Sequence, residues 1–205
     1  MRLALNESSM GQQRLRMVIG LGNPGEAYSR TRHNTGFMVV DALSDAYTIP
    51  LNKTKYDTVF GRGTVEGMDV LLAKPMAYMN RSGFPVQHLS HYFRILREDL
   101  LVVHDDIDLE FGRLKIKEKG GHGGHKGLRS IMDALGGGDF TRLRIGVGRP
   151  EAGRQVTDHV LGGFSNDEAK VLDRIVLTAR EAVVTILCKG TREGMNRFNN
   201  SRTQI

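Results

Sequence analysis

Residues 17–25 read MVIGLGNPG, and the predicted fold depends on this stretch. Its apolar start shows no alternation with polar residues, which is typical of a strand that is covered on both faces. The glycines and Pro24 end the strand, because glycine adopts turn conformations and proline cannot donate a hydrogen bond to a ladder. Asn23 is therefore expected at the end of a buried strand.

A helix is expected soon after this turn. Asn34 or Thr35 is in a position to cap it, and His33 would then lie at its start. The apolar residues that recur at helical spacing are Phe37, Val40, Leu43 and Tyr47. An amide and an imidazole from neighbouring loops could thus meet at one end of the strand.

The composition is that of an ordinary globular protein. The chain has 205 residues, 40% hydrophobic and 25% charged, which is enough for one domain with a substantial core. No apolar run is long enough to cross a bilayer, and residues 1–15 lack the features of a signal peptide. We expect residues 1–15 to form a flexible N-terminal tail and residues 16–200 a single domain. The single cysteine, Cys188, excludes an internal disulfide and fits a cytoplasmic protein.

Strands alternate with helices along the rest of the chain. Patterns typical of strands occur at residues 56–65, 68–73, 100–103, 114–117 and 142–148, and helical periodicity occurs at residues 86–93, 128–135 and 171–186. Glu66-Gly67 predicts a hairpin between the first two of these strands, and Ser165 with Glu168 predicts a capping box at the start of the last of these helices. This order indicates an α/β fold with a mostly parallel sheet and one antiparallel hairpin. In such folds, sites lie at the carboxyl ends of the strands.

His33 and Asp105 are the leading candidates for acid–base chemistry. A carboxylate bound to one imidazole nitrogen fixes the tautomer and stabilises the imidazolium, so that the other nitrogen can take a proton from water. The alternative is a structural histidine and a solvated aspartate, and the sequence alone does not bring the two together. Asn23 and Asn80 could donate hydrogen bonds to a carbonyl group, although asparagine is also a common turn residue.

Other kinds of site have weaker support. Residues 20–25, GLGNPG, match a dinucleotide fingerprint, but that site needs a helix directly after the turn, and here helical periodicity starts later. In the glycine-rich loop at residues 120–127, His122 and His125 could form a metal site with His104-Asp105, although the spacing is not a settled zinc pattern. The chain has no Gly-x-Ser-x-Gly elbow, which argues against covalent catalysis.

The formal net charge of +6 favours a polyanionic partner, because neutralising phosphates releases counterions. Lys115, Lys117 and Lys119 share one face of a predicted strand, and Arg142 and Arg144 repeat this pattern on a later strand. These basic side chains could bind phosphates. The alternative is a solvated basic face.

Taken together, these motifs resemble the bacterial peptidyl-tRNA hydrolase family over residues 16–199. The matching segments are residues 20–25 (GLGNPG), 31–34 (TRHN), 74–75 (KP) with 78–80 (YMN), 104–108 (HDDID), 121–125 (GHGGH) and 142–146 (RLRIG). The resemblance implies a three-layer α/β/α fold with a twisted, mostly parallel mixed sheet. It also implies a monomeric cytoplasmic enzyme that hydrolyses the ester between a peptide and its tRNA, releasing free tRNA without a metal or other cofactor.

The resemblance further implies roles for individual residues. His33 is similar to the general base and Asp105 to its partner, while Asn23 resembles the residue that distinguishes a blocked amino group from a free one. The positions that contact the substrate near its terminal nucleotide and peptide correspond to Tyr28, Tyr78 and Asn80. The basic positions that bind tRNA phosphates correspond to Lys115, Lys117 and Arg144.

Lys126 departs from the family pattern, which usually has asparagine after the second histidine of the Gly-His-Gly-Gly-His loop. A lysine cannot accept a hydrogen bond, but it can bind a phosphate or a carbonyl group, so Lys126 is also a candidate for substrate binding. The rival interpretation is a non-catalytic RNA-binding relative on the same fold, resembling a splicing cofactor. The presence of Asn23, His33, Asn80 and Asp105 argues against it, whereas Lys126 leaves it open.

Overall fold

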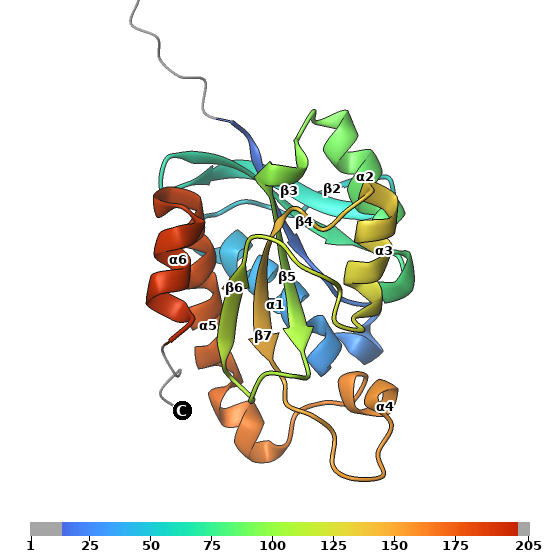
Figure 1. Cartoon of the computed structure of the whole chain (residues 1–205). Helices are drawn as coiled ribbons and strands as arrows, with labels where there is room; N and C mark the ends of the chain where they lie inside the picture. The colour runs from blue at the N-terminus through green and yellow to red at the C-terminus, as the bar shows by residue number, and fades with distance from the viewer. Residues whose placement is uncertain (1–13, 201–205) are drawn as a thin grey trace, which may run out of the picture.

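The computed structural model describes residues 14–200, which form one seven-stranded mixed sheet between two layers of helices (Figure 1). The strands are β1 (Arg16–Gly20), β2 (Lys53–Lys55), β3 (Thr58–Val65), β4 (Met68–Pro75), β5 (Leu100–Asp106), β6 (Leu114–Lys117) and β7 (Thr141–Gly146). Their order across the sheet is β2-β3-β4-β1-β5-β7-β6. β1 is parallel to β4 and β5, and β5 is parallel to β7. The predicted α/β fold with a mostly parallel mixed sheet is confirmed, whereas residues 1–13 of the predicted tail lie outside the described residues.

Both edges of the sheet are antiparallel. The hairpin of β3 and β4 around Glu66-Gly67 was expected, and both turn residues have positive φ. In addition, β2 runs antiparallel to β3, and β6 runs antiparallel to β7. The sequence did not predict β2, because its three residues, KTK, include no apolar side chain from which a period could be read.

Helices cover both faces of the sheet. One layer contains α1 (Thr35–Ala46), α5 (Asn166–Lys189) and α6 (Thr191–Phe198), and the other contains α2 (Gly83–Tyr92) and α3 (Lys126–Leu135). A short helix, α4 (Val156–Val160), lies beyond the ends of β5 and β7 (Figure 1). Single 3₁₀ turns are η1 (Glu26–Tyr28), η2 (Arg32–Asn34), η3 (Met79–Arg81) and η4 (Arg97–Asp99). None of the helices within residues 14–200 is long and apolar enough to cross a membrane.

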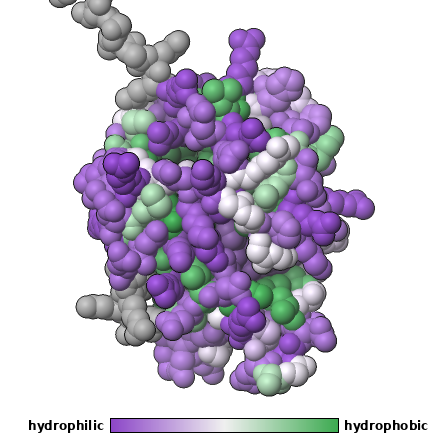
Figure 2. Space-filling view, viewed as in Figure 1, coloured by the Kyte–Doolittle hydropathy of each residue, from purple (hydrophilic) through white to green (hydrophobic). Residues whose placement is uncertain are grey.

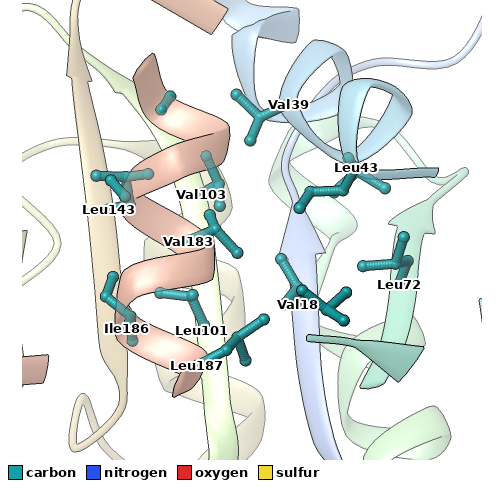
Figure 3. Close-up of a cluster of buried hydrophobic side chains, with 14 of the residues drawn as sticks. Val18, Val39, Leu43, Leu72, Leu101, Val103, Leu143, Val183, Ile186 and Leu187 are labelled. Carbon is teal, nitrogen blue, oxygen red and sulfur yellow. The ribbon is translucent and has the colours of Figure 1, made fainter. Parts of the chain in front are cut away.

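The apolar run of β1 is buried on both sides, as its lack of alternation predicts. Val18 packs into the cluster that β1, β5 and β7 form with α1 and α5 (Figure 3), whereas Met17 and Ile19 pack against the α2 and α3 layer. Successive side chains of a strand point to opposite faces, so each core takes alternate residues of the same strand. β1, the central strand of the sheet, therefore contributes to both hydrophobic cores, as do its neighbours β4 and β5.

The start of α5 is tied to the segment that carries His33. Ser165 and Glu168 form the predicted capping box, in which the Ser165 hydroxyl accepts from the Glu168 amide at 3.2 Å. The Glu168 carboxylate accepts from the Ser165 amide at 2.7 Å and also from Arg32 Nη2 at 2.6 Å. Since Arg32 belongs to η2, this partly buried ion pair holds η2 against the start of a long helix.

A close backbone approach sets the distance between the end of β1 and the start of α1. A Cβ atom on Gly20 would overlap the carbonyl of Gly36, and one on Gly36 would overlap backbone atoms of Leu21 and Val103. Only glycine leaves room for two backbones at such a distance. The turn after β1 and the turn before α1 are consequently brought together at the carboxyl end of β1.

Candidate active site

His33 and Asp105 meet at the carboxyl ends of β1 and β5. Asp105 is the next-to-last residue of β5, and His33 lies in η2 immediately before α1. His33 Nδ1 and Asp105 Oδ1 are 2.8 Å apart, although 72 positions separate the two residues in the chain. Both side chains are buried, with His33 8% and Asp105 2% exposed. Because Nδ1 donates its proton to the carboxylate, Nε2 of His33 is left with a free lone pair.

His125 is a second histidine on the same carboxylate oxygen, and the sequence did not predict this contact. It is the N-cap of α3, where its Nδ1 accepts hydrogen bonds from the amides of Gly127 and Leu128 at 3.1 and 3.2 Å. An Nδ1 that accepts leaves the proton on Nε2, which donates to Asp105 Oδ1 at 3.0 Å. The two imidazoles lie with centroids 5.0 Å apart. Asp105 therefore orients both rings through one oxygen.

The carboxylate of Asp105 is ionised despite its burial. Burial alone would raise its pKa, but the nearby imidazoles of His33 and His125, which interact with its charge and donate hydrogen bonds to it, hold the pKa well below its usual range. The group therefore stays negative throughout the neutral range. A permanent negative charge stabilises the imidazolium that forms when His33 accepts a proton.

His104, the residue before Asp105, is a neutral buried imidazole. Its Nδ1 donates to the Asp105 carbonyl at 2.6 Å, and its ring packs edge-on against His125 with a centroid distance of 4.8 Å. Its Nε2 is buried with no hydrogen-bond partner among the described residues. Burial, with a smaller contribution from His125, lowers the pKa of His104 well below its ordinary value of 6.5.

We expect this histidine to make the folded state less stable in acid. Below about pH 6.5 an unfolded chain protonates His104 but the folded chain does not, so the stabilisation is present above this pH and is lost as the pH falls. The loss approaches roughly 1.4 kcal/mol per pH unit. The free energy of unfolding, measured with urea, should differ less between pH 7.5 and pH 5.5 for His104→Asn than for the wild type. An identical difference in both proteins would contradict a neutral His104.

Asn23 is held with its amide nitrogen available. Its Oδ1 accepts from the Met79 amide at 2.8 Å, which leaves the NH₂ group free to donate. Asn34 pairs with the backbone of Asn23 in both directions, at 2.8 Å to its amide and 3.0 Å to its carbonyl. Asn34 does occupy the N-cap position of α1, but its side chain fixes Asn23 instead of capping the helix.

A cleft of about 510 Å³ contains these groups. Its lining includes Asn23, His33, Asp105 and His125, together with residues of α4 and the following turn, Val156, Thr157, Val160 and Leu161. The remaining predicted substrate-binding residues of this region also line it, namely Tyr28, Tyr78, Asn80 and Lys126. Tyr78 is 61% exposed, so its ring stands at the entrance. The cleft thus gathers an imidazole with a free nitrogen, an amide donor and aromatic side chains around one space.

Comparison with known proteins identifies the family of this chain. The family model described as peptidyl-tRNA hydrolase matches residues 17–205. The chain belongs to the peptidyl-tRNA hydrolase family. It is 43% identical over 183 residues to the peptidyl-tRNA hydrolase of Clostridium novyi, covering 89% of this chain and 97% of that protein. It is 47% identical over 181 residues to that of Bacillus pumilus, covering 88% and 96%.

Solved structures of this family have the same fold. The crystal structure of the peptidyl-tRNA hydrolase from Acinetobacter baumannii superposes with a TM-score of 0.86 at 41% sequence identity. The match covers 93% of this chain and 97% of that one. The resemblance inferred from the motifs is therefore confirmed over nearly the whole length.

The basic residues of this hydrolase-family chain differ in what they contact. Lys115 pairs in register with Arg144 and Lys117 with Arg142, so the four share one face of β6 and β7. Figure 2 shows a mostly hydrophilic surface on this side of the molecule. Lys117 is exposed and Lys115 half-buried, whereas Arg144 Nε donates to the Asp106 carboxylate at 2.5 Å. Lys115 and Lys117 are therefore better placed than Arg144 to meet a phosphate.

Arg142 does not belong to an exposed basic row, as the sequence pattern suggested. It is 2% exposed and donates to the carbonyls of Gly121 and Gly138 at 2.9 and 2.7 Å. Its guanidinium also lies over the ring of Phe140, 4.5 Å from the centroid. Arg142 thus holds the glycine-rich loop that carries His125, which is a structural role.

The metal site considered from the sequence is not assembled as that pattern suggested. His122 Nδ1 accepts from the Gly124 amide, and His104 Nδ1 donates to a carbonyl. The potential donor atoms that do gather within 4.8 Å are those of His33, Asp105 and His125. They face one another across hydrogen bonds of 2.8 and 3.0 Å, so a metal ion would have to displace both bridging protons. The absence of a metal from the chemistry stays a prediction, which a chelator can test.

Proposed function

We propose that this chain hydrolyses the ester bond between the peptide and the tRNA of peptidyl-tRNA, releasing free tRNA for translation, with water activated by His33. The observation that carries this proposal is the 2.8 Å hydrogen bond from His33 Nδ1 to Asp105 inside the cleft. It leaves Nε2 as the only ring nitrogen that can accept a proton from water. Membership of the peptidyl-tRNA hydrolase family supports the substrate.

The reaction proceeds by attack of water on the ester carbonyl. His33 Nε2 takes a proton as the water oxygen bonds to the carbonyl carbon, and Asp105 stabilises the resulting imidazolium. The amide of Asn23, or that of Asn80, donates to the developing oxyanion. The carbon–oxygen bond to the tRNA then breaks, and His33 returns the proton to the departing 3′ oxygen. The balance is one water consumed, one peptide carboxyl group formed and one tRNA hydroxyl group restored.

The remaining cleft residues bind the substrate on either side of the ester. Tyr28 and Tyr78 offer ring faces for stacking against the terminal base or the peptide. Asn23 also distinguishes a blocked amino group from a free one, because its rigidly held NH₂ group can donate to an amide carbonyl but repels an ammonium group. Lys126 is exposed at the first residue of α3 and meets a phosphate or carbonyl oxygen of the substrate.

Lys115, Lys117 and Arg144 bind tRNA phosphates in this proposal. We expect Lys115→Ala and Lys117→Ala each to weaken tRNA binding and to reduce the slope of log K against log salt by about 1. Lys53→Ala, an exposed lysine of β2 at the opposite edge of the sheet, is the control and should leave the slope unchanged. Fluorescence titrations between low and moderate salt measure the slopes. Wild-type slopes in both β6 variants would show that the tRNA phosphates bind elsewhere on the protein.

A non-catalytic RNA-binding role is not favoured. The curated relatives across nearly the whole chain are peptidyl-tRNA hydrolases. A protein that only binds RNA would have no use for a buried carboxylate that orients two imidazoles in a cleft. We further propose that the chain acts as a monomer in the cytoplasm and that residues 16–200 form one folding unit. The molar mass measured by light scattering during gel filtration tests whether the chain is a monomer.

The first test compares an N-acetylated aminoacyl-tRNA with the same aminoacyl-tRNA carrying a free amino group, with a chelator present. We expect cleavage of the blocked substrate and much slower cleavage of the free one. Both reactions should be insensitive to the chelator, because the proposed mechanism uses no metal. Tight tRNA binding without cleavage of either substrate would contradict the proposed function.

A further inference from the structure

Lys126 carries an exposed positive charge at the catalytic cleft. It is the first residue of α3, directly after His125, and its side chain lines the cleft. Within residues 14–200, this side chain forms no ion pair and no hydrogen bond. Its ammonium group is therefore free to act on a bound substrate.

The two carboxylates in the lining of the cleft do not offset this charge. Asp105 is 2% exposed, and its Oδ1 accepts from His33 and His125 at 2.8 and 3.0 Å. The Asp106 carboxylate accepts from Arg144 Nε at 2.5 Å, so its charge is already paired. Among the described residues that line the cleft, no exposed and unpaired carboxylate is thus available to a positive group of the substrate.

A second cleft, of about 1050 Å³, runs between α2 and α3, and Lys126 lines it as well. The carboxylates of this second cleft are Asp57 and Asp133, and Arg129 lies 3.8 Å from Asp133. Neither carboxylate lines the catalytic cleft. Lys126 is therefore the charged residue at the boundary of the two clefts.

The start of α3 is packed against the segment that holds Asn23. A Cβ atom on Gly127, the residue after Lys126, would lie 2.5 Å from Sδ of Met79 and 3.0 Å from Cδ1 of Leu21. The Met79 amide in turn donates to Asn23 Oδ1 at 2.8 Å. This packing fixes the backbone at Lys126 close to the turn whose amide group is proposed to meet the substrate.

A charge at this place acts across the catalytic cleft. A compact space of about 510 Å³ is roughly as wide as the Debye length at physiological salt, about 8 Å, so salt screens the charge only in part. The surrounding protein lowers the effective dielectric constant and strengthens the interaction further. The α-amino group of an esterified amino acid is bonded to the carbon next to the carbonyl that water attacks. In its protonated form it must therefore come within range of Lys126.

We propose that Lys126 repels the free α-ammonium group of aminoacyl-tRNA and so directs the enzyme toward substrates whose amino group is acylated. This inference rests on the proposed function. Acylation of the amino group removes its positive charge, so peptidyl-tRNA meets no such repulsion. The effect is separate from that of Asn23, which donates a hydrogen bond to the amide carbonyl of an acylated substrate.

The test uses two esters of the same tRNA that differ in the charge of one group. One is phenylalanyl-tRNA, and the other is phenyllactyl-tRNA, in which a hydroxyl group replaces the amino group. Neither ester offers Asn23 an amide carbonyl. At about pH 6.5 the amino group is largely protonated, because α-amino groups titrate near pH 8. The ratio of kcat/KM for the hydroxy ester to kcat/KM for the amino ester, each corrected for hydrolysis without enzyme, measures the penalty for the ammonium group.

For Lys126→Met this ratio should fall about threefold to tenfold, because a neutral side chain of similar length removes the repulsion. Lys126→Arg keeps the charge and should keep the wild-type ratio. Any contact of Lys126 with the tRNA affects both esters equally and cancels in the ratio. Lys53→Met is the matched control, since Lys53 is an exposed lysine of β2 that lines neither cleft, and its ratio should equal that of the wild type.

A wild-type ratio in Lys126→Met would overturn this inference while leaving the hydrolase intact. An equal fall in Lys126→Met and Lys126→Arg would also overturn it, because the shape of the side chain and not its charge would then decide. The same holds if the wild type cleaves N-acetylphenylalanyl-tRNA but does not prefer the hydroxy ester to the amino ester. A wild type that cleaves neither N-acetylphenylalanyl-tRNA nor the hydroxy ester would instead overturn the proposed function.

Discussion

His33→Ala is expected to lower the turnover of N-acetylated aminoacyl-tRNA by about 10²- to 10⁴-fold, the range for loss of a general base. Alanine cannot take a proton from the attacking water, and no other imidazole of the cleft has a free nitrogen. Both ring nitrogens of His125 are engaged, Nδ1 with the α3 amides and Nε2 with Asp105. Binding of tRNA should change little, because His33 is only 8% exposed.

Single-turnover rates at saturating enzyme separate the chemical step from binding. His91→Ala is the matched control, since His91 is an exposed histidine of α2 that lines neither cleft. It should retain the full rate. If His33→Ala kept a rate near that of the wild type, another group would have to be the base.

Asp105→Asn and Asp105→Ala are expected to divide the role of Asp105 into charge and orientation. An asparagine oxygen can still accept from His33 Nδ1 and His125 Nε2, which both bind Oδ1, so this variant loses mainly the negative charge. Asp105→Asn should lower turnover by about 10²-fold or more, because the imidazolium loses its counter-charge. Asp105→Ala should lower turnover further, since both rings also lose their acceptor.

A double-mutant cycle tests whether Asp105 acts through His33. Asp105→Asn introduced into the His33→Ala protein should have little additional effect, because residues that work as a unit are strongly non-additive. Thermal unfolding of each variant checks that the fold is intact. Independent, multiplicative losses would show that Asp105 supports the reaction by a route that does not involve His33.

The central part of the fold was predictable from the sequence because hydrophobic pattern and turn residues agree there. The unalternating run of β1, the hairpin at Glu66-Gly67 and the capping box of α5 are all found where expected. The edge strand β2 was not predicted, since its pairing depends on β3 and not on its own side chains. The antiparallel direction of β6 is likewise decided by its pairing with β7.

The candidate site was predictable only in part. His33, Asp105 and Asn23 each follow or end a recognisable element, and the structure brings them into one cleft. His125 was not recognised as a partner of Asp105, because that contact depends on its acting as a helix cap. The only hint was its place directly before the apolar periodicity of α3. The burial of Arg142 was not predicted either. The alternation of residues along β7 does not show that the glycine-rich loop, whose Gly121 carbonyl accepts from Arg142, covers this side chain.

The contact of Gly20 with Gly36 has a consequence for altering the substrate range of the enzyme. At Gly20 and Gly36, main-chain atoms set the spacing of the two turns that carry Asn23 and His33, and the Asn34 side chain also ties the second turn to the backbone of Asn23. The aromatic residues at the entrance and the short helix α4 belong to other segments. Libraries that vary Tyr28, Tyr78 and Val156 can therefore reshape the walls while the proton acceptor keeps its place.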